Sequence, residues 1–124
     1  MFPVNLLTAS LAFVVYGSWA AYVNSEYGLE ALLRAGLGQG LYAFFSTWLV
    51  TAAARTFLQK IGYNRKGLFI SFLLTFCVML AIPVTLHTLL RTRDVWEAIL
   101  PGLIWGSVYI LLVLRLSYQT DRDD

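Results

Sequence analysis

The charged residues divide the chain into long uncharged stretches. No charged side chain occurs before Glu26, and uncharged runs then cover 35–54, 67–90 and 98–114. A helix needs about 20 mostly apolar residues to cross the hydrocarbon core of a bilayer. The pattern therefore predicts four transmembrane helices, which cover Val4–Val23, Ala35–Phe57, Gly67–Leu90 and Trp96–Tyr118.

The polar residues inside these stretches favour helices over the strands of a membrane barrel. Barrel strands alternate polar and apolar residues over about 10 positions. Between 68 and 82, Ser71 and Thr75 are the only hydroxyl side chains and the remaining residues are apolar. The first stretch lacks the basic start of a signal peptide and exceeds the length of its apolar region, so we expect a retained helix.

Composition agrees with a membrane protein. The 124 residues are 59% hydrophobic and 13% charged, whereas soluble domains carry about 25% charged residues. The single cysteine, Cys77, excludes a fold held by intrachain disulfides, and the net charge of +2 is too small to indicate a nucleic-acid partner. We therefore expect one domain over 1–124, an all-α integral membrane protein built as a four-transmembrane-helix bundle.

Lysine and arginine predict the orientation. With four spans, both termini and the middle loop share one side of the membrane. That side carries six basic residues and the other side carries three, namely Arg34, Arg91 and Arg93. Because basic residues are retained in the cytoplasm, we predict a bacterial-type inner (plasma) membrane protein with its N-terminus and C-terminus both cytoplasmic.

Glycine, asparagine and proline predict local features. Leucines at helical spacing over 29–33 predict a segment that either lies at the membrane interface or extends the second helix by two turns, and the extension is favoured. Gly62 and Asn64 suit a helix end and a following N-cap. Pro83 removes the intrahelical partner of the Met79 carbonyl, so a kink and a replacement donor are expected. Pro101 predicts a milder bend.

Small residues recur at a spacing of four. Residues 30–36 resemble 97–102, and the pairs Gly36/Gly40 and Gly102/Gly106 belong to these two segments. The similarity allows an interpretation in which two helical hairpins repeat. Small residues one turn apart let helices approach closely. These helix-packing glycines suit either packing within the bundle, which comes first, or a homodimer.

The second helix carries a polar stripe that is a candidate ligand path. Its members fall within about half of the helix circumference, where membrane helices face the protein interior or a water-filled path. Arg115 lies at a similar depth near the end of the fourth helix. The alternative for both arginines is a side chain that reaches out to the interface. The candidate ligand-binding residues are Gln39, Ser46, Thr47, Thr51, Arg55 and Arg115.

Several kinds of chemistry have no support in the sequence. No carboxylate lies inside a span, which argues against proton-coupled cation antiport. No nucleophile–base pair or phosphate-binding loop is visible, so we expect neither an enzyme nor a cofactor. His87 and Cys77 alone make no metal site. Because His87 precedes Arg91 by one turn, we expect its polar tip near the headgroups.

Two functional hypotheses remain. In the first, this small polytopic membrane protein binds or translocates an anionic amphiphile such as a lipid phosphate, because the intramembrane charge is entirely basic. Arg55 and Arg115 then hold the headgroup. In the alternative, the chain is a non-enzymatic accessory or assembly subunit of a larger membrane complex. The expected partners are a membrane lipid and either a second copy or another membrane protein, with no nucleic acid.

Overall fold

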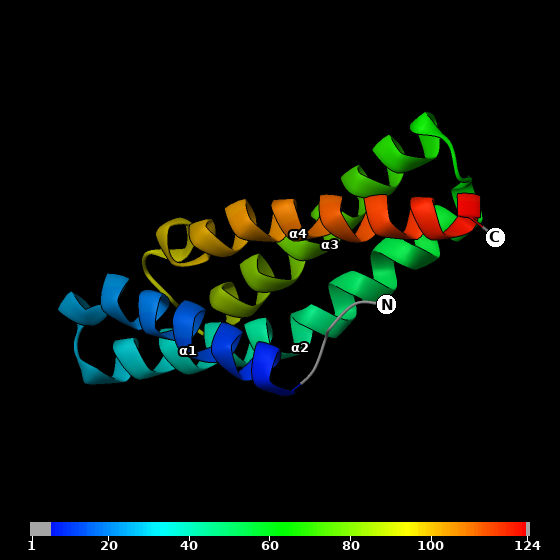
Figure 1. The fold of residues 1–124 in the computed structure, drawn as a ribbon. Helices are drawn as coiled ribbons and strands as arrows, with labels where there is room; N and C mark the ends of the chain where they lie inside the picture. The colour runs from blue at the N-terminus through cyan, green and yellow to red at the C-terminus, as the bar shows by residue number, and fades with distance from the viewer. Residues whose placement is uncertain (1–5, 124) are drawn as a thin grey trace.

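The chain folds as an all-α bundle. The computed structural model describes residues 6–123, and within this range no strand occurs. Each of the four long helices is long and apolar enough to cross a membrane, which confirms the predicted class. The elements in chain order are α1 (Leu6–Val23), the short 3-10 helix η1 (Ser25–Tyr27), α2 (Leu29–Ile61), α3 (Arg65–Leu89) and α4 (Val95–Asp123) (Figure 1).

The local signals for helix ends agree with the structure. Helix α2 begins at Leu29, so the extension of the second span is confirmed. Gly62 ends α2 with a φ of 135°, a region that favours glycine. The Asn64 side chain accepts a hydrogen bond of 2.8 Å from the Gly67 amide and caps α3. Residues 4 and 5 of the predicted first span lie outside the described residues.

The helices form two hairpins, α1–α2 and α3–α4, and the two helices of each hairpin differ in length. The segments 24–28 and 90–94 lie together at one end of the bundle, here called the Asn24 end, and the loop 62–64 lies at the opposite Gly62 end (Figure 1). With 18 residues α1 is about 27 Å long, whereas the 33 residues of α2 extend for about 50 Å. Helix α1 therefore covers only the half of α2 that adjoins the Asn24 end.

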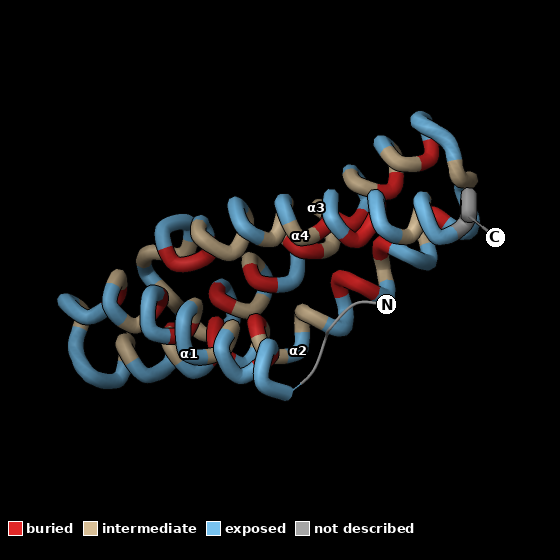
Figure 2. Tube along the Cα trace, viewed as in Figure 1, coloured by how far each residue is buried: buried red, intermediate tan, exposed pale blue. Residues whose placement is uncertain are grey.

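This difference in length produces two cores of different character. Near the Asn24 end, Ala20, Ala35 and Ala98 bring α1, α2 and α4 into close contact. Towards the Gly62 end, α2, α3 and α4 pack larger side chains without α1. These are Val50, Ala54, Leu58, Met79, Ile110, Val113 and Leu114. Buried residues follow the inner faces of the helices, and the outer faces are exposed (Figure 2).

Three of the four paired glycines, Gly36, Gly40 and Gly106, pack closely within the bundle, whereas Gly102 lines a cavity. A Cβ atom at Gly36 would lie 2.9 Å from the Ala21 Cβ, and one at Gly40 would lie 3.1 Å from the Phe13 ring, so both face α1. Gly106 faces the Met79 side chain of α3. Their role in packing inside the four-helix unit accounts for their spacing, and a homodimer stays a prediction.

Each proline inside a helix has its orphaned carbonyl paired by an aromatic donor from another helix. Pro83 leaves the Met79 carbonyl without its intrahelical donor, and the Tyr42 hydroxyl donates to this oxygen over 3.0 Å. Pro101 likewise affects the Glu97 carbonyl, which accepts a 2.7 Å hydrogen bond from Trp19 Nε1. These bonds join α2 to α3 and α1 to α4, so the prolines create tertiary contacts.

We expect Tyr42→Phe to lower the free energy of unfolding by about 1–3 kcal/mol, because it leaves a buried carbonyl unpaired. The loss should shrink in a Pro83→Ala background, since the amide of the new residue can donate to Met79. The measurement is a double-mutant cycle of unfolding in mild detergent, with a coupling energy of at least about 1 kcal/mol as the expected result. Additive effects of the two substitutions would contradict this role of Tyr42.

Candidate functional site

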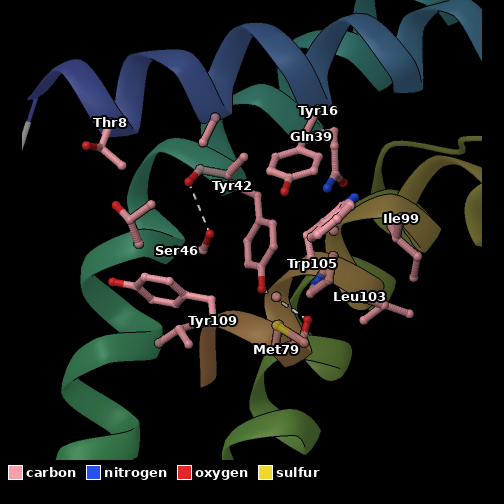
Figure 3. Close-up of a pocket in the computed structure, with 17 residues that line it drawn as sticks. Thr8, Tyr16, Gln39, Tyr42, Ser46, Met79, Ile99, Leu103, Trp105 and Tyr109 are labelled. Atoms are coloured by element: carbon pink, nitrogen blue, oxygen red, sulfur yellow. Dashed lines mark hydrogen bonds between the residues drawn. The ribbon is translucent and has the colours of Figure 1, made fainter. Parts of the chain in front are cut away.

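A cavity of about 250 Å³ lies in the middle of the bundle, between the two cores. All four long helices contribute to its wall. Tyr16, Gln39 and Trp105 lie at one end of it, and Thr8, Ser46 and Tyr109 lie at the other (Figure 3). The remaining wall includes Tyr42, Thr47, Val50, Met79, Pro83, Ile99, Gly102, Leu103 and Gly106.

The cavity is partly open, and its exposed lining residues lie on α1 and α4. Trp105 lines it and is nevertheless 63% exposed, and Thr8 on the facing helix is exposed as well. These residues therefore form a rim on the outer surface of the bundle. In a bilayer this outer surface of the bundle would contact lipid.

The lining residues that the structure describes are uncharged and mostly apolar, and most of their hydroxyl groups already donate hydrogen bonds. Ser46 and Thr47 donate to backbone carbonyls of α2 one turn earlier. The Thr51 hydroxyl donates to the Thr47 carbonyl, so in the 2.7 Å contact between Thr51 Oγ1 and the Tyr109 hydroxyl the tyrosine is the donor. These oxygens can still accept hydrogen bonds from a ligand.

A buried polar chain connects the cavity to the α3–α4 loop. His87 Nε2 lies 2.7 Å from Gln39 Oε1, and His87 Nδ1 lies 2.8 Å from Thr92 Oγ1. The amide oxygen can only accept, so Nε2–H donates to it and the Thr92 hydroxyl donates to Nδ1. His87 is completely buried. The expectation of a histidine tip near the headgroups is therefore wrong, because these two partners satisfy the ring inside the protein.

A second polar cluster ties the two hairpins together at the Asn24 end. The buried Asn24 side chain accepts a hydrogen bond from the Asp94 amide, and the Tyr27 hydroxyl donates to the Asp94 carboxylate over 3.0 Å. This hydrogen bond raises the pKa of Tyr27 above its ordinary value, so the phenol stays a donor at neutral pH. Arg93 lies over the Tyr27 ring, 4.9 Å from its centroid.

The structure brings together some of the sequence candidates and leaves others apart. Gln39, Ser46 and Thr47 line the cavity. Thr51 lies outside it, towards the Gly62 end, and contacts the lining residue Tyr109. Arg55 and Arg115 are exposed and lie outside the cavity wall. The polar stripe of α2 therefore leads from the cavity to an exposed arginine near the Gly62 end.

Sequence reasoning missed most of the aromatic wall. Tyr42 and Tyr109 carry hydroxyl groups that bond inside the bundle, and Trp105 forms the rim. A usable signal was present, because Tyr42 lies three residues after Gln39 and four before Ser46 and so extends the polar stripe. On this face of a membrane helix, the tyrosine hydroxyl makes Tyr42 a member of the polar stripe.

Comparisons of the chain with protein-family models, with curated proteins and with solved structures gave no match.

Proposed function

We propose that this membrane protein binds or translocates an anionic amphiphile, such as a lipid phosphate, that reaches it from within the bilayer. The observation that carries the proposal is a partly open cavity, with exposed lining residues on α1 and α4 and with two exposed arginines at matched depth beyond it. In this proposal the arginines hold the acidic headgroup, and the hydrocarbon chain occupies the apolar part of the cavity.

The matched depth of the arginines follows from the register of α2 and α4. These helices run in the same direction, and the contact between Thr51 and Tyr109 places those residues at similar depth. Arg55 and Arg115 follow them by four and six residues, or about 6 and 9 Å along the axis. Two guanidinium groups at nearly one depth suit a phosphate, which arginine recognises through paired hydrogen bonds.

The cavity supports the placement of the chain. Thr47 is eight residues, or about 12 Å, from Arg55 along α2. A headgroup near the arginines thus has its chain beside the exposed part of the cavity wall. The excess of basic residues at the Gly62 end favours a cytoplasmic location for that end and for both termini, in an inner (plasma) membrane.

The test is native mass spectrometry of the protein released from its own membrane in mild detergent. We expect a discrete phosphate-bearing lipid on the wild type and at least about a tenfold loss in the Arg55→Leu/Arg115→Leu double variant, because charged hydrogen bonds disappear. Gly102→Leu, which fills the cavity, should also lose the lipid. Gly102→Ala is its matched control, and Arg34→Leu at the opposite end is the control for charge.

Two outcomes of this measurement would contradict the proposal. An adduct that persists in the double variant removes the assigned role of the arginines. A second polypeptide without a lipid supports the accessory or assembly subunit instead. A particle containing two copies bears on the predicted homodimer separately.

A further inference from the structure

The amide of Gln39 presents a hydrogen-bond donor that the fold leaves unused. Gln39 is 2% exposed, and its Oε1 accepts from His87. Among the described residues, Gln39 Nε2 has no hydrogen-bond partner. The nitrogen would lie 3.7 Å from a Cβ atom at Gly102, and both residues line the cavity. Because this N–H group is unpaired and Gln39 lines the cavity, the group is suited to an acceptor that enters the cavity.

The orientation of this amide is imposed by the protein. Because His87 Nε2–H donates to Gln39 Oε1, the NH2 group must point away from the histidine and towards the cavity. Thr92 holds the other ring nitrogen, so the ring itself cannot turn. His87 is therefore a positioning residue for the donor on Gln39.

A second unused donor lies at the same end of the cavity. Tyr16 comes from α1 and lies next to Gln39 in the close-up (Figure 3). Within residues 6–123, its hydroxyl has no hydrogen-bond partner. Trp105 and Tyr42 supply flat aromatic walls nearby. Two donors between aromatic rings match an oxygen acceptor carried on a flat, uncharged ring.

The lack of charged residues in the described wall disfavours an anion at the Gln39 end of the cavity. None of the described residues that line the cavity is charged, and moving an ion into such surroundings costs several kcal/mol. Gln39 is also 16 residues, or about 24 Å, from Arg55 along α2. An acceptor held by Gln39 therefore cannot belong to a headgroup held by the arginines. It belongs to a different molecule, which enters from the half of the bilayer nearer the Asn24 end.

We propose that the Gln39 end of the cavity binds an uncharged quinone-type lipid, whose ring carbonyl accepts hydrogen bonds from Gln39 Nε2 and the Tyr16 hydroxyl. The ring lies between the aromatic walls, and the apolar chain leaves past the exposed lining residues of α1 and α4. The volume of about 250 Å³ suits a single ring, so this ring and the chain of an anionic lipid would occupy the cavity in turn and not together. This site goes beyond the proposed function, because it needs neither arginine.

The test compares two probes in phosphatidylcholine nanodiscs by native mass spectrometry titration. Decylubiquinone carries the ring carbonyls, and decylbenzene has a ring and the same chain without them. We expect Gln39→Leu to weaken decylubiquinone binding about tenfold and to leave decylbenzene binding unchanged, since only the first probe loses a hydrogen bond. Tyr16→Phe, which keeps its ring, should weaken only decylubiquinone. His87→Leu should do so too, because the amide is then free to rotate.

Two controls separate this site from other effects. Thr85→Val also removes a hydroxyl, but Thr85 is exposed, lies outside the cavity wall and donates to the Ala81 carbonyl, so decylubiquinone binding should persist. The Arg55→Leu/Arg115→Leu variant should also bind decylubiquinone normally, even if it has lost an anionic lipid. Loss of decylubiquinone in the arginine variant would overturn the independence of the two sites.

Three results would overturn the assignment itself. The first is equal affinity of decylubiquinone for the wild type, Gln39→Leu and Tyr16→Phe. The second is an equal loss of both probes in Gln39→Leu, which would indicate a packing effect. The third is Gln39-dependent binding of dioctanoylglycerol without binding of decylubiquinone, which would replace the ring by an ester carbonyl.

Discussion

Replacing Gly17 by alanine should lower the free energy of unfolding by about 1–3 kcal/mol, the usual cost of overpacking a tight contact. A Cβ atom at this position would lie 2.9 Å from the Gly36 carbonyl oxygen and 3.2 Å from the Gly40 Cα. Both atoms belong to the backbone of α2, so no side chain can move aside. Helix α1 must shift away from α2 as a whole, which weakens the contact that holds α1 in the bundle.

The measurement is reversible unfolding in mild detergent with increasing dodecyl sulfate. Gly102→Ala is the matched control, because its new Cβ would be at an ordinary contact distance of 3.7 Å from Gln39 Nε2. Alanine is also the better helix former, so the control should be as stable as the wild type or slightly more stable. Equal stability of the two variants would show that α1 and α2 do not approach this closely.

His87→Leu should lower the free energy of unfolding by about 2–4 kcal/mol. The substitution removes the imidazole ring, so the buried oxygen of Gln39 and the hydroxyl of Thr92 lose their shared hydrogen-bond partner. An unpaired buried group costs about 1–3 kcal/mol, and the half-buried Thr92 hydroxyl adds a smaller loss. In the membrane no water replaces the lost partners at Gln39.

A double variant distinguishes a lost hydrogen bond from a change of volume. In Gln39→Leu/His87→Leu both polar partners become apolar, so the combined loss should be smaller than the sum of the single losses. Thr88→Val is the neighbouring control, since Thr88 is exposed and donates only within α3 to the Val84 carbonyl. A strictly additive double variant would mean that Gln39 and His87 do not interact.

Several features of this protein could be predicted from short stretches of sequence. The number of spans depends on uncharged runs long enough to cross a bilayer, and a run of this kind is visible without any tertiary contact. Gly62 and Asn64 mark the α2–α3 turn because a positive φ and an N-cap are local requirements. The candidate stripe on α2 also depended only on helical periodicity, and three of its members line the cavity.

The positions of His87, Arg55 and Arg115 could not be predicted in the same way. All three are polar residues near the ends of apolar spans, so their sequence contexts are alike. His87 is buried because Gln39, 48 residues earlier, and Thr92 both reach its ring, whereas the two arginines are exposed. Burial of a polar group in a membrane protein depends on whether a partner from another helix is present.

The two proline-containing helices show the same difference between features that depend on local sequence and features that depend on contacts between helices. The presence of Pro83 was enough to predict that the Met79 carbonyl lacks its intrahelical donor, because proline has no N–H. The identity of the replacement donors, Tyr42 for Met79 and Trp19 for Glu97, depends on how the helices pack against one another. The reason is physical: periodicity specifies which side of a helix is polar, whereas the rotation and register between packed helices decide which groups meet.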